Sequence, residues 1–355
     1  MKTNSVLLAC VFSASVAVAA PWIENARIVP GSPAKGLDAT LADLARGEDA
    51  WVAYMVPMLP GDHDLCCHDF RGPDTRAACR LDGNSFSASS GDERTRSAGP
   101  EAHELWVLIR VGEGRVQHVR SFSGHCALDA GGARVHTLDG VDPQASVELL
   151  RRLALDRDRA ELGDEALTAL SFHGEESAGR ALLQFTAAKS PEALRAKAAF
   201  WLGVTRGAES LEHLTTMARK DPSGEVREQA VFAISASDAP GSEAILIELA
   251  RRDPSPHIRS TALFWLGQEA GERVADTLRE AVDDDPDVEV KEKAVFALSQ
   301  LPAERGVPLL IDVARSSSRH PAVRRAAMFW LGQSGDPRAL EFFEAVLAGS
   351  TGGPP

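Results

Sequence analysis

The chain has 355 residues, of which 44% are hydrophobic, and it carries a formal net charge of −13 at pH 7. So acidic a chain repels nucleic acids and anionic membranes, which argues against both as partners and favours solubility. After the N-terminal segment, no apolar run approaches the roughly 18 residues that indicate a membrane-spanning helix.

The first predicted element is a secretory signal peptide over residues 1–19. Lys2 precedes an apolar stretch of small residues at 6–18, and a small-residue motif ends at Ala19. This order predicts export to the periplasm or the extracellular space, with cleavage after Ala19. A lipoprotein attached through Cys10 is the alternative, although it leaves almost no apolar stretch before the cysteine. Loss of Lys2 takes the formal charge from −13 to −14.

Residues 20–140 are predicted to form one small α+β domain, in which we recognise no family. A buried-strand pattern spans residues 51–56, and residues 105–119 predict a hairpin with a Gly-containing turn. Residues 37–46 indicate one short amphipathic helix. Residues 82–100, which are charged and rich in Ser and Gly, are predicted to be a mobile loop.

This region contains every cysteine of the predicted mature chain: Cys66, Cys67, Cys79 and Cys126. An even number of cysteines in an exported segment favours two disulfides. A bond between the adjacent Cys66 and Cys67 would be strained. One of the two is therefore expected to pair with Cys79 and the other with Cys126, in an order that the sequence leaves open.

A copper or zinc site formed by His63, Cys66, Cys67 and His68 is the alternative. It requires reduced thiolates in an oxidising compartment, and its spacing matches no familiar metal site, so we favour the disulfides and predict no cofactor. The neighbours His125 and Cys126 also suggest a Cys–His dyad. Adjacent residues on a strand point to opposite faces, however, so Cys126 is better explained by a disulfide.

From residue 142 to residue 348 the sequence repeats itself, and residues 349–355 are predicted to be a disordered tail. Phenylalanines recur at a nearly constant interval: Phe200, Phe232, Phe264, Phe296 and Phe329. A weaker copy lies at residues 167–171. Each copy has one helical pattern and then a second helix that is apolar nearly all round, and Asp-Pro closes the first helix at Asp221-Pro222, Asp253-Pro254 and Asp285-Pro286. Such helix pairs cannot bury their faces alone, so neighbours must stack.

The second helices begin in the same register: Leu194-Arg195, Val226-Arg227, Ile258-Arg259, Val290-Lys291 and Val323-Arg324. Together with the Asp-Pro turns, this pattern resembles the HEAT-repeat class, in particular the subtype named from phycobilisome lyases. The resemblance covers residues 142–348. It implies a mostly α fold, a right-handed α-solenoid of about six helix pairs preceded by the small disulfide-bonded α+β domain. Protein binding is the commonest function of the class.

One enzymatic member of this class, deoxyhypusine hydroxylase, needs His-Glu pairs directly after the basic position of several repeats. Here these pairs read Ala196-Lys197, Glu228-Gln229, Ser260-Thr261, Glu292-Lys293 and Arg325-Ala326. The sequence therefore excludes that activity, and we expect a protein that is not an enzyme. The single His173-Gly174-Glu175-Glu176 is predicted to lie in a solvated loop.

A second period, spanning two successive repeats, is superposed on the first. The position after Phe alternates between large and small: Trp201, Ala233, Trp265, Ala297 and Trp330. One interpretation is a repeat core in which these rings and the preceding phenylalanines fill complementary volumes in neighbouring layers. The other is a row of tryptophans that lines a groove for a peptide or a glycan.

The surface predicted to bind a partner is the polar face of the second helices: Arg195, Arg227, Glu228, Arg259, Lys291, Glu292, Arg324 and Arg325. A ladder in which each Arg pairs with the Asp of a neighbouring Asp-Pro turn is the preferred alternative for the recurring arginines. The predicted function is an exported scaffold that binds a protein or peptide. A redox or metal-binding protein, with its chemistry in the Cys/His-rich domain, is the alternative.

Overall fold

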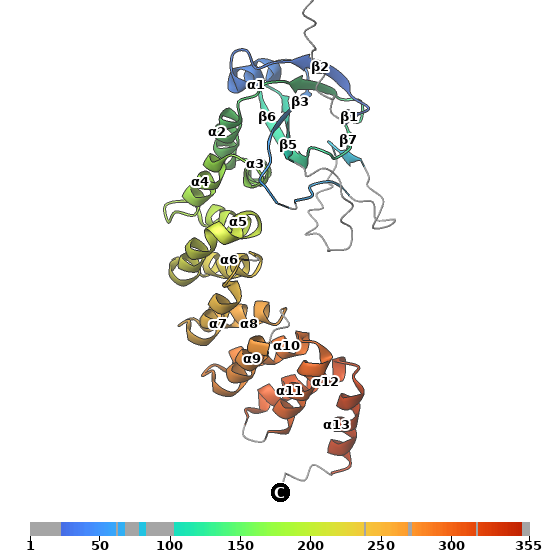
Figure 1. The fold of residues 1–355 in the computed structure, drawn as a ribbon, viewed down its shortest axis with the longest axis vertical. Coiled ribbons are helices and arrows are strands. Elements are labelled where there is room, and N and C mark those ends of the chain that lie inside the picture. Colours follow the sequence, from blue (N-terminus) through green and yellow to red (C-terminus); the bar gives the residue numbers. More distant parts are fainter. Residues whose placement is uncertain are drawn as a thin grey trace, which may run out of the picture. The chain divides into compact units, whose positions relative to one another are not determined.

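The structure, a computed structural model, describes residues 23–61, 63–67, 78–82, 103–237, 239–268, 272–316 and 319–349. The chain divides into two compact units, residues 1–142 and residues 143–355 (Figure 1). The predicted signal peptide, the predicted loop after Asp82 and the predicted tail after Gly349 lie outside the described residues. No described helix has both the length and the apolar character that crossing a membrane requires.

The N-terminal unit is built on a five-stranded sheet in the order β2-β8-β3-β5-β6. The strands are β2 (Arg27–Gly31), β3 (Ala50–Pro57), β5 (Glu104–Gly112), β6 (Arg115–Ser123) and β8 (Arg134–Leu138). β5 pairs antiparallel with β3 and β6, whereas β8 pairs parallel with β2 and β3. Helix α1 (Leu37–Ala45) packs against β3, β5 and β6.

The predicted strand, hairpin and helix of this unit are confirmed by β3, β5, β6 and α1. β2 was not predicted, because it is exposed along its whole length and so lacks an alternating apolar pattern. Three two-residue strands, β1 (Ile23–Glu24), β7 (Leu128–Asp129) and β4 (Cys79–Arg80), form a second, parallel sheet in the order β1-β7-β4.

In its described residues, the C-terminal unit is a stack of six helix pairs followed by one further helix, and Figure 1 labels these helices along the stack. The first helices of the pairs are α2 (Pro143–Ala154), α4 (Glu176–Phe185), the second half of α5 (Glu192–Lys220), α7 (Ser242–Arg252), α9 (Glu272–Asp284) and α11 (Ala303–Arg315). The second helices are α3 (Ala160–Ser171), the first half of α5, α6 (Gly224–Ser235), α8 (Pro256–Leu266), α10 (Val288–Gln300) and α12 (Pro321–Gln333). The last helix is α13 (Pro337–Leu347).

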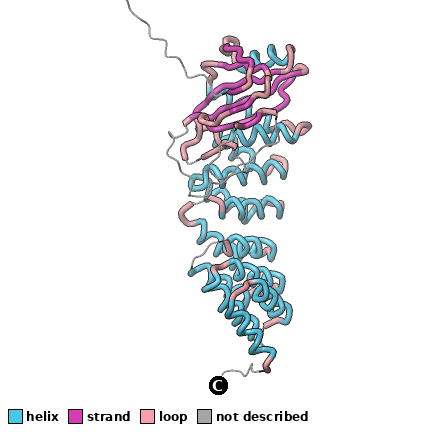
Figure 2. Tube along the Cα trace, turned by 90° about the vertical axis from the view of Figure 1, so that its right-hand side faces the viewer, coloured by secondary structure: helices cyan, strands magenta, loops and turns pink. Residues whose placement is uncertain are grey.

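Helices of the same kind contact each other along the stack, and Figure 2 shows the helices in successive layers. The second helices α6, α8, α10 and α12 form one layer, and the first helices α7, α9, α11 continue into α13 in the other. α5 comprises two helices joined by a kink at Arg206, where φ is −135° and ψ is 36°. The predicted solenoid of about six helix pairs is thus confirmed.

The Asp-Pro turns separate the two helices of a pair in a uniform way. Asp221 follows the last residue of α5 with an extended backbone, and its carboxylate accepts a hydrogen bond of 2.9 Å from the N–H of Ser223. Asp253 and Asp285 accept the same bond, at 2.9 Å, from the N–H two residues on. The recurring aspartate therefore fixes the turn in which proline ends the preceding helix.

The alternation over two repeats follows from two kinds of interface between pairs. A Cβ atom added to Gly203 would lie 2.7 Å from the Cα of Ala233, and one on Gly267 would lie 3.0 Å from the Cα of Ala297. Gly203 and Gly267 lie two residues after Trp201 and Trp265. A repeat that contains Trp therefore approaches the next repeat so closely that only glycine fits at the position two residues after the Trp. At the following interface, where Phe232 meets Trp265, aromatic rings fill the space with centroids 4.6 Å apart.

His173 corrects the prediction of a solvated loop, since its side chain is 0% exposed. Arg206, at the kink of α5, donates hydrogen bonds to the backbone carbonyls of His173, at 2.9 Å, and of Ser171. The imidazole Nδ1 accepts a hydrogen bond from the N–H of Glu175 at 3.2 Å. Burial, reinforced by the charge of Arg206, lowers the pKa of His173 to about 4.

This shift predicts that the repeat unit loses stability on mild acidification. The unfolded chain protonates His173 near its ordinary pKa of about 6.5, whereas the folded chain binds that proton only near pH 4, so acid favours unfolding. Between pH 7 and pH 4 this group should remove about 3 kcal/mol of unfolding free energy. The His173→Asn variant keeps an acceptor for the N–H of Glu175. Between pH 7 and pH 4, its free energy of unfolding in urea should fall by about 3 kcal/mol less than that of the wild type. An equal loss in both proteins would contradict the assignment.

Candidate protein-binding site

Three of the predicted binding residues, Arg195, Arg227 and Arg259, are engaged between repeats. Each forms an ion pair with the aspartate of the next Asp-Pro turn: Arg195–Asp221 at 2.9 Å, Arg227–Asp253 at 2.7 Å and Arg259–Asp285 at 2.7 Å. The ladder interpretation is therefore confirmed for these three arginines. Because their guanidinium groups are largely buried, they are not part of an open binding surface, which corrects that expectation.

The other predicted binding residues lie in different surroundings. Lys291 is half-buried, and its Nζ donates to the carbonyl of Asp283 at 2.6 Å. Arg324 is half-buried as well, and its Nε is buried with no hydrogen-bond partner within the described part of the chain. Glu228 and Arg325 are exposed. Glu228 and Arg325 are therefore the most accessible charged side chains of the predicted set, and Glu292, which is half-buried, remains partly accessible.

A continuous ladder of aromatic rings runs along the second helices. It consists of Phe172, Phe200, Trp201, Phe232, Phe264, Trp265, Phe296, Phe329 and Trp330, which we call the aromatic ladder. Within a repeat, Phe lies edge-on to the following Trp, as in Phe264–Trp265 with centroids 4.9 Å apart. Between repeats, Phe200 stacks on Phe232 at 5.6 Å with planes 11° apart. Each ring thus contacts the next without a break.

The rings of the aromatic ladder are not fully enclosed. Trp201, Trp265 and Trp330 are half-buried, while Phe264 and Phe329 are 36% and 58% exposed. The structure therefore lies between the two interpretations of the tryptophan row: one side of the ladder packs between repeats, and the other side faces solvent. A helical wheel gives the direction of these side chains but not how deeply they are buried.

A depression of about 360 Å³ opens beside the ladder between three of its rings. Phe200, Phe232 and Trp265 line it, together with Glu225, Glu228 and Gln229 of α6. Glu228 also lies 2.8 Å from the Nε2 of His257. Glu225 was missed by the sequence analysis, although its place two helical turns before Phe232 puts it on the same face.

In the N-terminal unit, the disulfides are Cys66–Cys126 and Cys67–Cys79. This settles the order that the sequence left open. Cys66, Cys79 and Cys126 belong to one buried cluster that includes Trp51 and Trp106. The surroundings of the sulfur atoms are therefore those of a packed core.

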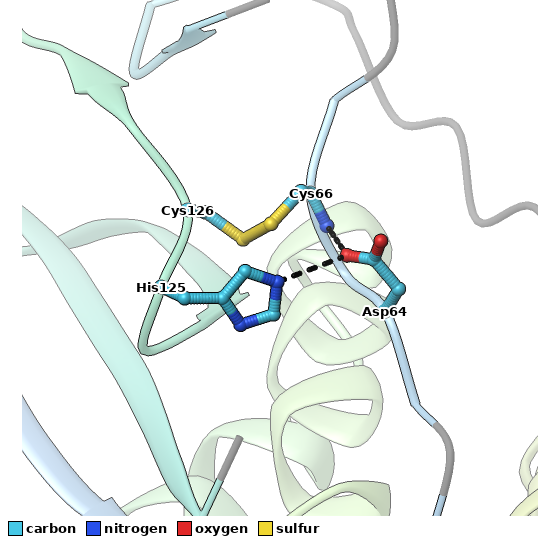
Figure 3. A group of neighbouring side chains, drawn as sticks. All are labelled: Asp64, Cys66, His125 and Cys126. Atoms are coloured by element: carbon cyan, nitrogen blue, oxygen red, sulfur yellow. Dashed lines mark hydrogen bonds and ion pairs between the residues drawn. A yellow bond between two sulfur atoms is a disulfide. The ribbon is translucent and has the colours of Figure 1, made fainter. Parts of the chain in front are cut away.

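Asp64 and His125 lie beside the Cys66–Cys126 bond, as Figure 3 shows. The carboxylate of Asp64 accepts a hydrogen bond of 2.9 Å from the N–H of Cys66 and lies 3.7 Å from the Nε2 of His125. A metal at this point would find one imidazole and one carboxylate, because both sulfur atoms are bonded to each other. Of the predicted metal alternative, Cys67 is also in a disulfide, and His68 lies outside the described residues.

Part of the repeat region matches a known family model. Residues 211–299 and 283–353 match the family model of HEAT repeats. No curated protein sequence matches the chain.

Among solved structures, the chain is similar to human deoxyhypusine hydroxylase, with 23% identity over 57% of this chain and 85% of that one and a TM-score of 0.26. It is similar to the phycocyanin lyase complex of Nostoc, with 18% identity over 43% of this chain and 98% of that one and a TM-score of 0.35. It is also similar to a condensin subcomplex of S. pombe, with 17% identity over 59% of this chain and 32% of that one and a TM-score of 0.39. Such likeness concerns the fold alone. Residues 211–353 are HEAT repeats, which the helix pairs and their Asp-Pro turns display.

Proposed function

We propose that this chain is an exported, non-catalytic scaffold that binds another protein or peptide through its aromatic ladder. The observation that carries the proposal is the partial exposure of a continuous row of rings. Single exposed apolar side chains are ordinary on a protein surface. A contiguous row is different, because exposed apolar patches in soluble proteins mark interaction sites.

Two features support export. The N-terminal sequence has the charge, apolar stretch and cleavage motif of a signal peptide, with Ala20 as the first residue of the mature protein. Four cysteines form two disulfides, which persist mainly in oxidising compartments. Sequencing of the protein recovered from the exported fraction should begin at Ala20, whereas a lipidated N-terminus at Cys10 would replace this part of the proposal.

Binding through the ladder predicts that a variant with polar residues at its most exposed rings loses its partner. The Phe264→Ser/Phe329→Ser variant should fail to retain proteins of the exported fraction that the wild-type chain retains in a pull-down. The control is Leu340→Ser on α13, which also removes an exposed apolar side chain, 61% exposed, that is not part of the ladder. Equal retention by wild type and the ladder variant would contradict the proposal.

A second candidate function, redox or metal chemistry in the N-terminal unit, is favoured by one observation. Asp64 and His125 are placed beside the Cys66–Cys126 bond, where they can exchange protons with a reduced thiol. Counting free thiols on the purified oxidised protein, together with elemental analysis, tests it. A protein with neither free thiols nor bound metal would remove this candidate.

A further inference from the structure

The residues that line the depression beside the aromatic ladder recur one two-repeat block further along the chain. The first cluster consists of Phe200, Phe232 and Trp265 with Glu225 and Glu228. The second cluster consists of the residues at the equivalent positions: Phe264, Phe296 and Trp330 with Glu289 and Glu292. The glutamates and the aromatic residues of the first cluster thus all recur in the second.

The ring geometry of the two clusters is nearly the same. In the first cluster the stacked pair has centroids 5.6 Å apart and planes 11° apart, and in the second the values are 5.9 Å and 9°. The tilted Phe–Trp pair has centroids 4.6 Å apart at 51° in the first cluster, and 4.9 Å apart at 55° in the second. The chain therefore presents two matching aromatic surfaces.

Both clusters place carboxylates beside these rings. Glu225 and Glu228 precede Phe232 by seven and four residues, so they lie on its face of α6, and Glu289 and Glu292 precede Phe296 in the same way on α10. Apart from Glu228, which contacts His257, these glutamates have no ion-pair partner among the residues described. Gln229 also lines the depression at the first cluster. The equivalent position beside the second cluster is Lys293, so the surroundings of the second cluster are less acidic.

We propose that each cluster takes one arginine side chain from an extended basic segment of the partner protein. A guanidinium group stacks on aromatic rings and donates paired hydrogen bonds to carboxylates, so it uses both parts of the cluster. A neutral peptide or a glycan would leave the carboxylates without charged partners. The formal charge of −13 attracts a basic segment at longer range.

The repeat spacing determines how far apart the two arginines should be. Axes of neighbouring packed helices are about 8–10 Å apart, so two layers separate the clusters by roughly 16–20 Å. An extended chain advances about 3.3 Å per residue, which corresponds to about five or six residues between the arginines. This inference rests on the proposed function, because it specifies the chemistry of the partner that the ladder binds.

The test measures binding of labelled peptides to the full mature chain by fluorescence polarisation at about 0.15 M salt. Each peptide carries two arginines in a neutral Gly/Ser/Leu background, and their separation varies from about three to about nine residues. Affinity should peak at a separation of about five or six residues. Replacing one arginine by citrulline, which has nearly the same shape but no charge, should weaken binding about tenfold.

Matched variants locate the binding site. Glu225→Gln/Glu228→Gln should weaken binding of the best peptide about tenfold. Glu248→Gln/Glu280→Gln makes the same change in charge on α7 and α9, in the other layer of the stack, and should leave the affinity unchanged. Equal binding of the citrulline peptides, an affinity that does not depend on separation, or equal loss in both double variants would overturn the inference.

These outcomes are distinguishable from failure of the proposed function. If the ladder variant loses its partner in the pull-down but no arginine peptide binds, the scaffold function stands and the partner's chemistry is not basic. If the ladder variant retains its partner, both proposals are overturned.

Discussion

The Asp285→Ala variant should lower the unfolding free energy of the repeat unit by about 3–5 kcal/mol, because it leaves the guanidinium group of Arg259 buried without its ion-pair partner. Arg259 donates to the two carboxylate oxygens of Asp285 at 2.7 and 2.9 Å, and the two side chains are only 9% and 5% exposed. The same carboxylate accepts the N–H of Asp287, so the variant also loses the bond that fixes the turn. Urea unfolding followed by the helical circular dichroism signal measures the effect.

Two controls separate burial from charge. The exposed pair Arg251–Glu280 has the same 2.7 Å separation, yet Glu280→Ala should cost less than about 1 kcal/mol, because water screens both groups. The double variant Arg259→Met/Asp285→Ala should recover part of the loss, since no charge is then left buried. Equal destabilisation by Glu280→Ala and Asp285→Ala would show that burial does not strengthen the contribution of the Arg259–Asp285 ion pair to stability.

The arginine ladder could be predicted from the sequence because its partners recur at a fixed distance. In each of the three ion pairs the arginine and the aspartate are separated by the same number of residues in the sequence. The repeat therefore brings the two side chains of every pair to the equivalent interface between repeats. The exposure of Phe329 could not be predicted in this way. Each earlier phenylalanine contacts a ring of the next second helix. Among the residues described, α12 is followed by α13, which continues the other layer, so Phe329 contacts no ring of a later second helix and stays exposed.

The N-terminal unit shows a different limit of sequence reasoning. Strain between neighbours excluded the Cys66–Cys67 bond, but the choice between Cys79 and Cys126 depends on how distant strands meet. In the parallel pairing of β4 with β7, Cys79 lies opposite Leu128, which follows Cys126 by two residues in the sequence. Cys79 and Cys126 therefore lie near each other, and both approach Cys66 and Cys67. Asp64 and His125, whose side chains lie beside the Cys66–Cys126 bond, are far apart in the sequence. Their proximity therefore could not be predicted from the sequence either.

Replacing Cys66 and Cys126 together by alanine should lower the stability of the N-terminal unit by about 4 kcal/mol. The bond joins residues 60 positions apart, and the entropy of the unfolded chain that such a link removes is of that size. The Cys67→Ala/Cys79→Ala variant, whose bond spans 12 positions, should cost about 3 kcal/mol. Hydrogen exchange of the amides in β3 and β5 reports on this unit without interference from the helices.

The same measurement under a mild thiol reductant distinguishes a structural bond from a redox centre. A structural Cys66–Cys126 bond resists reduction while the sheet is folded, because both sulfur atoms are in the buried cluster and opening the bond costs the unit its stability. Protection of β3 and β5 should therefore disappear together with the disulfide, and His125→Gln should leave both unchanged. If the bond opens while β3 and β5 stay protected, and His125→Gln slows that opening, then Asp64 and His125 serve thiol chemistry and the structural assignment of this disulfide is wrong.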